Sequence, residues 1–186
     1  MKKYILIAGV NGAGKSTLYQ SLQSLQGMPR VNTDEILRDF GDWRDMADVI
    51  TAGKIAVKKI AKYFDEGITF NQETTLCGKS IIKNITKARN RGYFIELHYI
   101  GVESADIAKE RVAVRMKQGG HGIADRDIER RYRETFDNLK IVLPECDLAA
   151  FYDNTIEFRR FAIYMIGKPV RVSPEIPLWY SKLSKS

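Results

Sequence analysis

The chain has 186 residues, of which 44% are hydrophobic, and it carries a net charge of +7. This length predicts one globular domain with a buried core, over residues 1–186. No window approaches the 18 consecutive apolar residues of a membrane span, and the short N-terminal apolar run is not a secretory signal. Two cysteines without metal-ligand spacing are expected to be free thiols. We therefore expect a cytoplasmic protein without a membrane partner.

The first predicted strand, 4–8, is apolar throughout, as is typical of a central parallel strand. A complete P-loop pattern follows it, from a glycine at position 9 to Gly-Lys-Ser at 14–16. The glycines leave room for a polyphosphate against the backbone, the lysine reaches its β- and γ-phosphates, and the serine hydroxyl ligates Mg²⁺. We therefore expect ATP and Mg²⁺ as cofactors. The candidate ATP-binding residues are Gly9, Asn11, Gly12, Ala13, Gly14, Lys15, Ser16, Thr17 and Asn154, and the candidate metal ligand is Ser16.

Beyond the P-loop, strand and helix patterns alternate along the chain. Further strands are expected at 30–32, 68–71, 93–100 and 148–152, with an additional edge strand at 161–166. Helices are expected at 15–26, about 34–40, 46–65, 80–91, 104–117 and 125–142. This alternation predicts a three-layer α/β fold of the P-loop NTPase and kinase type, with a parallel sheet of about five strands and a helical lid. The basic C-terminal stretch at about 168–186 contains three prolines and is expected to be irregular.

Two carboxylates fall at the carboxyl ends of predicted strands, where open α/β sheets hold their ligands. Asp34 follows the strand at 30–32, and Glu73 follows the strand at 68–71. Phosphoryl transfer to an alcohol needs a carboxylate that takes the hydroxyl proton, so both are candidates. The alternative for Asp34, or for Thr33, is a helix N-cap. No hydrophobic run followed by aspartate marks a Walker B segment, so a second Mg²⁺ ligand is not assigned.

Three glycines in four residues interrupt the helical pattern at 119–122, between two helices rich in arginine. This predicts a lid over about 117–127 whose arginines close on the transferring phosphate. The alternative is a pair of solvated helices with i, i+4 salt links, because acidic residues are interspersed. The candidate catalytic residues are Lys15, Asp34, Arg115, Arg126, Arg130 and Arg131.

Four stretches together resemble the small zeta-toxin-type P-loop kinases: 9–17 (GVNGAGKST), 32–34 (NTD), 71–75 (NQETT) and 119–132 (GGHGIADRDIERRY). The resemblance covers about residues 3–155. It implies phosphorylation of a hydroxyl on a nucleotide-activated amino sugar, with Asp34 as general base, with Glu73 and Thr75 holding the acceptor, and with an antitoxin protein as a partner. The chain departs from the family in carrying Ala124 where the lid commonly has proline, and in lacking the larger substrate region of long zeta toxins.

The favoured hypothesis is an ATP-dependent kinase that phosphorylates a hydroxyl of a small molecule. A second hypothesis is a kinase acting on nucleic-acid ends, aided by the six basic residues of 159–186, although nucleic acid is the less favoured partner. A third is a nucleotide-binding regulatory module with little or no turnover. The sequence does not identify the acceptor.

Overall fold

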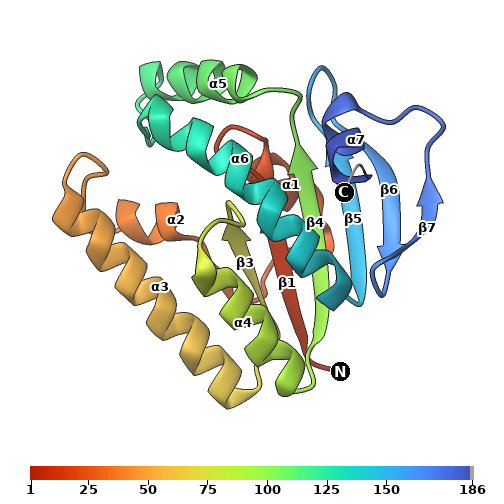
Figure 1. The fold of residues 1–186 in the computed structure, drawn as a ribbon. Helices are drawn as coiled ribbons and strands as arrows, with labels where there is room; N and C mark the ends of the chain where they lie inside the picture. Colours follow the sequence, from red (N-terminus) through yellow and green to blue (C-terminus); the bar gives the residue numbers. More distant parts are fainter. Residues whose placement is uncertain (185–186) are drawn as a thin grey trace.

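The computed structural model describes residues 1–184, in which helices cover a central sheet (Figure 1). The strands are β1 Lys3–Ala8, β2 Arg30–Val31, β3 Phe70–Thr74, β4 Phe94–Gly101, β5 Leu148–Asp153, β6 Arg159–Met165 and β7 Lys168–Val172. The α-helices are α1 Lys15–Ser21, α2 Thr33–Arg38, α3 Met46–Glu66, α4 Lys79–Asn90, α5 Ala105–Lys117, α6 Asp125–Val142 and α7 Leu178–Ser184, with 3₁₀ turns η1 Gln23–Leu25 and η2 Leu143–Glu145. No helix within residues 1–184 is long and apolar enough to cross a membrane.

The strand order is β2-β3-β1-β4-β5-β6-β7, so β1 lies inside the sheet between β3 and β4. The first five strands in this order run parallel, while β6 and β7 form an antiparallel hairpin at one edge. Ala8, the last residue of β1, pairs in register with Thr74 of β3 and with Tyr99 of β4. The segments that follow these three strands therefore leave the sheet at one common edge.

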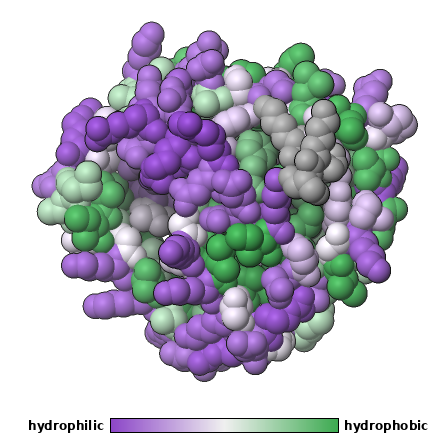
Figure 2. Space-filling view, viewed as in Figure 1, coloured by the Kyte–Doolittle hydropathy of each residue, from purple (hydrophilic) through white to green (hydrophobic). Residues whose placement is uncertain are grey.

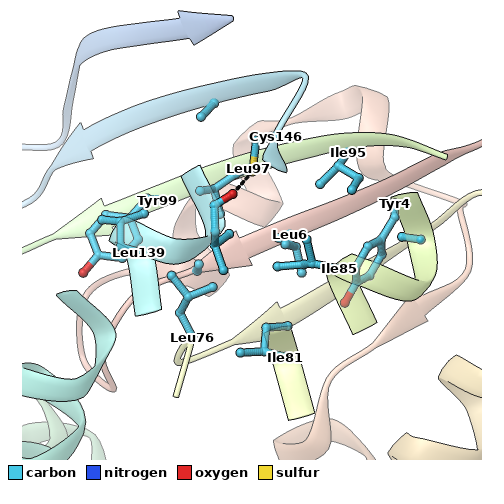
Figure 3. Close-up of a cluster of buried hydrophobic side chains, with 14 of the residues drawn as sticks. Tyr4, Leu6, Leu76, Ile81, Ile85, Ile95, Leu97, Tyr99, Leu139 and Cys146 are labelled. Carbon is cyan, nitrogen blue, oxygen red and sulfur yellow. Dashed lines mark hydrogen bonds between the residues drawn. The ribbon is translucent and has the colours of Figure 1, made fainter. Parts of the chain in front are cut away.

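Alternating side chains of β1 face two different hydrophobic layers. Tyr4 and Leu6 lie in one core with Ile81 and Ile85 of α4 (Figure 3). The same core holds Ala8 and buried residues of α2 and α3. Ile5 and Ile7 face the other layer, which contains buried residues of α1 and α5. A central strand that is buried on both faces is the arrangement that its unbroken apolar run predicts.

The fold class is confirmed as a three-layer P-loop kinase type, but the predicted sheet of about five strands is wrong. The sheet has seven strands within residues 1–184. The two strands beyond the fifth are β6 and β7, and β7 lies in the stretch predicted to be irregular. Pro169 is compatible with β7 because an edge strand has amides that need no partner strand. The irregular-tail prediction fails again at α7, which places Trp179 fully inside the core.

The third predicted strand is displaced along the chain. The sequence predicts it at 68–71, but β3 is Phe70–Thr74, so Glu73 lies inside a strand and pairs in register with Ile7. The polar residues from Asn71 onward indicate the end of a strand in the sequence. In the structure, Asn71 is completely buried and accepts a hydrogen bond of 3.2 Å from Arg30. A buried amide with its own partner is tolerated inside a sheet, which is why the boundary was misjudged.

Candidate active site

The loop between β1 and α1 has the tight course that its glycines predict. Gly12 and Gly14 have φ values of 80° and 103°. A Cβ on Gly12 would lie 2.6 Å from the carbonyl oxygen of Ala108, and one on Gly14 would lie 2.5 Å from Nδ2 of Asn154. These glycines are therefore required by neighbouring protein atoms as well as by the expected approach of phosphate. The Asn154 side chain also donates a 2.8 Å hydrogen bond to the carbonyl of Ala13, so it braces the loop.

Lys15 begins α1 and lies against the loop itself. Its ammonium donates hydrogen bonds to the carbonyls of Gly9 at 2.9 Å and Val10 at 3.1 Å. The residue is buried, with only 8% of it exposed. Burial lowers the pKa of Lys15, and the negative charges of Glu73 and Asp34 oppose that shift. The ammonium of Lys15 therefore lies close enough to the carboxylates of Glu73 and Asp34 to be stabilised by their charges.

Ser16 and Thr17 occupy the first turn of α1 and are both exposed. A hydroxyl in this position is accessible to a metal ion that accompanies bound phosphate. Among residues 1–184, no cluster of three or more histidine, cysteine, aspartate or glutamate side chains is placed to hold a metal. The expectation that Ser16 ligates Mg²⁺ rests on the P-loop pattern.

Asp34 lies in the first turn of α2 but is not the cap of that helix. Asn32 is the N-cap, since its side-chain oxygen accepts from the amides of Asp34 at 2.9 Å and Glu35 at 3.4 Å. The alternative that Thr33 or Asp34 caps the helix is wrong. The Asp34 carboxylate is 39% exposed, and its Oδ1 lies 3.6 Å from Nε2 of His121. It is therefore free for a role other than capping.

Glu73 is held by residues that the sequence reasoning missed. Its Oε2 accepts from Nη2 of Arg30 at 2.6 Å and from Nδ2 of Asn32 at 3.1 Å. The Arg30 guanidinium also lies 3.6 Å from the ring centroid of Tyr19. Arg30 is the first residue of the two-residue strand β2, and its sequence context gives no signal of this pairing because the partner is 43 positions away. Glu73 is thus oriented by β2 and α1 as well as by its own strand.

The segment after β3, which contains Thr75, is tied to α6. Leu76 has a φ of 60°, which a residue with a branched side chain rarely adopts. The amide of Asn138 donates to the carbonyl of Leu76 at 2.7 Å, and the amide of Gly78 donates to Glu134 at 2.6 Å. Thr75 is half-buried in this braced segment. These contacts hold the segment in its turn.

The arginines of the predicted lid do not form one group. Arg131 donates from Nη1 to Oδ1 of Asn11 in the P-loop at 3.0 Å. Arg115 has buried Nε and Nη2 atoms without a hydrogen-bond partner in the described chain. Arg130, however, forms ion pairs with Asp127 at 3.2 Å and Glu134 at 2.9 Å in its own helix, as the alternative of solvated helices predicts. Arg126 is exposed. The structure therefore brings Arg115 and Arg131, but not Arg130, toward the loop.

Hydrophilic side chains gather on this face of the molecule over the N-terminal half of α6 (Figure 2). His98 lies in β4 and has a protein partner at each ring nitrogen. It is 7% exposed, and its ring nitrogens lie 3.1 Å from the Tyr152 hydroxyl and 2.9 Å from the Glu96 carboxylate. The chain's other histidine, His121, is the one that faces the candidate site.

The strand order, the two helical layers and the loop between β1 and α1 define a P-loop kinase fold. The family model described as zeta toxin matches residues 1–161. This chain therefore belongs to the zeta toxin family. An uncharacterised protein of Haemophilus influenzae is 33% identical over 130 residues, which is 70% of this chain and 92% of that protein.

Solved structures of low sequence identity share the fold. The AvrRxo1-ORF1:-ORF2 structure with ATP has a TM-score of 0.77 at 14% identity, covering 99% of this chain and 64% of that one. The chain therefore spans a little under two thirds of that relative. The PezAT chromosomal toxin-antitoxin system of Streptococcus pneumoniae gives a TM-score of 0.64 at 19% identity, covering 83% and 69% of the two chains. The Pnkp1/Rnl/Hen1 RNA repair complex gives 0.59 at 17% identity, covering 75% and 46%.

Proposed function

We propose that this protein is an ATP-dependent kinase that transfers the γ-phosphate to a hydroxyl of a small molecule, such as a nucleotide-activated sugar. The observation that carries the proposal is the position of Asp34. Its carboxylate is 39% exposed, takes no part in capping, and acts electrostatically on the buried Lys15 of the P-loop. A carboxylate near the phosphate-binding lysine can receive the acceptor proton as the new phosphate ester bond forms.

The P-loop residues account for nucleotide binding in this proposal. The amides of the loop and the ammonium of Lys15 bind phosphate oxygens, and the exposed Ser16 hydroxyl would hold the Mg²⁺ that accompanies ATP. Bound Mg²⁺ neutralises phosphate charge as the transfer proceeds. A hydrogen bond of Lys15 to the carbonyl of Gly9 or Val10 is exchanged for one to phosphate when the nucleotide binds.

Arg115 and Arg131 provide the positive charge that would face the transferring phosphate. The buried Nε and Nη2 atoms of Arg115 have no partner in the described chain, so an anionic oxygen would satisfy donors that are otherwise costly to bury. Arg131 contacts the P-loop through Asn11. A planar guanidinium suits the charge that spreads over the transferring phosphoryl oxygens. We assign stabilisation of the transition state to these two arginines, with Arg126 and Arg130 as weaker candidates.

Glu73 and Thr75 lie on the β3 side of the same sheet edge, where the acceptor is expected. The hydrogen bonds that Glu73 Oε2 accepts from Arg30 and Asn32 fix the orientation of its carboxylate. We propose that the other oxygen of Glu73 and the Thr75 side chain bind the acceptor. We further propose a protein antitoxin as partner and a cytoplasmic location, on the basis of family membership and of the structural similarity to the PezAT toxin-antitoxin system.

The test incubates the purified protein with γ-labelled ATP, Mg²⁺ and a metabolite extract, and then searches for a metabolite that gains a phosphate mass. Transfer to a small molecule supports the proposal. Label on an oligonucleotide end would favour the polynucleotide-kinase alternative, and label only in inorganic phosphate would favour the regulatory module. Asp34→Asn is expected to keep ATP affinity and to lose about a hundredfold or more of the transfer rate.

A further inference from the structure

His121 lies in the turn between α5 and α6, opposite Asp34 of α2. Its Nε2 is 3.6 Å from Oδ1 of Asp34, and its side chain is 17% exposed. The Trp43 ring lies beside the imidazole, with the two ring centroids 5.8 Å apart. A Cβ added to the next residue, Gly122, would lie 2.6 Å from the Trp43 ring and 2.8 Å from Sδ of Met116. The close packing around Gly122 therefore fixes the turn that carries His121.

The charges around His121 come from every element packed against it. They are Asp34 and Arg38 of α2, Asp42 of the following loop, Arg115 of α5 and Arg131 of α6. Burial is the largest influence and lowers the pKa of His121, the Asp34 charge raises it, and the three arginines lower it. The imidazole is therefore neutral at neutral pH and carries one nitrogen that can accept a proton.

We propose that His121 acts through Asp34, with Nε2 of the neutral ring accepting the proton that Asp34 removes from the acceptor hydroxyl. This inference rests on the kinase reaction proposed above. It makes His121 the residue that receives the proton after Asp34. The separation of 3.6 Å exceeds a hydrogen bond, and a shift of less than about 1 Å would bring the two atoms within hydrogen-bond distance.

The proton balance of the proposed step is complete without a further reagent. The acceptor oxygen forms a bond to the γ-phosphorus while the bond from that phosphorus to the ADP oxygen breaks. The hydroxyl proton moves to Asp34 and then to Nε2 of His121, which leaves a carboxylate beside an imidazolium. Release of that proton to solvent restores the neutral ring. His121 acts through Asp34 and does not touch the reacting atoms.

A permanently charged imidazolium would have the opposite effect on Asp34. It would stabilise the carboxylate and weaken its attraction for the acceptor proton. The arginines Arg38, Arg115 and Arg131 oppose that charged form, so they keep the ring neutral before the transfer and favour release of the accepted proton to solvent. When the pH falls below the lowered pKa of His121, the ring becomes protonated and can no longer accept the proton from Asp34. Turnover should accordingly fall on the acid side of the pH profile.

The test compares His121→Gln, His121→Ala and Asp34→Asn over a range of pH, with the rate normalised to the number of sites that bind a non-hydrolysable ATP analogue. His121→Gln should lower kcat about tenfold, leave both KM values within about twofold, and move the acid limb to lower pH. Added imidazole should restore part of the kcat of His121→Ala. The matched control is His98→Gln, which changes the chain's other histidine in β4 and should retain the acid limb.

Two different failures can be told apart. If Asp34→Asn is inactive while His121→Gln keeps the wild-type kcat and acid limb, the inference is overturned and the proposed function stands. Failure of imidazole to rescue a folded, nucleotide-binding His121→Ala would also overturn the proton-accepting role. If Asp34→Asn itself turns over normally, the proposed base is wrong and the role of His121 fails with it.

Discussion

Arg30 donates from Nη2 to Oε2 of Glu73 across 2.6 Å, and both side chains are only 9% exposed. The same guanidinium bonds to Asn71 and Glu35 and stacks on Tyr19. The pair therefore joins β2, β3, α1 and α2 through one side chain. Truncation of a buried ion pair leaves the other charge without its partner, which is more costly than the pair is favourable.

We expect Arg30→Met to lower the free energy of unfolding by about 3–5 kcal/mol, because it leaves Glu73 buried and unpaired. Glu73→Gln should cost less, about 1–3 kcal/mol, since Arg30 retains Asn71 and Glu35 as partners. Urea denaturation measures both values. The double variant Arg30→Met/Glu73→Met should be less unstable than the sum of its single changes. Additive losses, or losses below about 0.5 kcal/mol, would show that the two charges are not coupled.

Lys15→Ala should abolish nucleotide binding and transfer while leaving the fold intact. The change loses two hydrogen bonds to loop carbonyls but also removes an ammonium that burial disfavours. These effects oppose each other, so the free energy of unfolding should stay within about 1 kcal/mol of wild type. Calorimetric titration with ATP and thermal denaturation measure the two properties. A folded Lys15→Ala protein with full activity would contradict the assignment of the P-loop.

Arg115→Ala should reduce kcat by more than about tenfold and weaken ATP binding less, because spread charge develops in the transition state. Arg115→Lys should restore only part of the rate, since it lacks the guanidinium fork. Arg133→Ala is the matched control, because this exposed residue bonds, within the described part of the chain, only to the backbone of its own helix. Steady-state kinetics with saturating acceptor separates the two parameters.

Hydrogen exchange across 117–127, with and without a non-hydrolysable ATP analogue and Mg²⁺, tests the lid directly. Gly119 is exposed and has a φ of 80°, so the amide hydrogens of this turn should exchange readily before nucleotide binds. Contacts from Arg115 and Arg131 to phosphate should then slow exchange. Equal exchange in both conditions would favour two solvated helices without a closing movement.

Trp179→Ala should lower the free energy of unfolding by about 3–5 kcal/mol, as expected for a fully buried aromatic side chain. Its Nε1 also donates to Asp153 at 2.9 Å, and its ring contacts Gly101. Leu178→Ala is the adjacent control, because Leu178 is 71% exposed and should change stability by less than about 0.5 kcal/mol. Equal effects of the two substitutions would show that α7 does not stabilise the core.

The central strands and the P-loop could be predicted because their signals are local. The apolar run of β1 and the glycines after it specify a buried strand and a turn without reference to the rest of the chain. The C-terminal elements could not be predicted in this way. Pro169 breaks most strands but not an edge strand, and whether β7 is an edge depends on the order of the whole sheet.

The residues of the candidate site likewise fall into those with a local sequence signal and those without one. Lys15 could be found from the P-loop pattern, and Asp34 and Glu73 from their positions at predicted strand ends, although β3 begins and ends later than the sequence predicts. Arg30 and His121 could not, because each becomes informative only through a partner far away in the sequence, Glu73 for the one and Asp34 for the other. Among the lid arginines, spacing predicts a shared face but not which face meets the P-loop, so Arg130 was grouped with Arg131.

Helix α6 crosses from one layer of the molecule to the other. Near its start, Ile128 packs in the layer of α1 and α5, while Leu139 and Val142 near its end pack in the layer of α3 and α4. Arg131 lies between these two anchors. The helix cannot swing as a rigid arm unless one hydrophobic layer is opened, so a nucleotide-driven movement would have to be confined to the turn before it. Heating that loosens either anchor would displace Arg131 at the same time, and catalytic inactivation should therefore coincide with global melting rather than precede it.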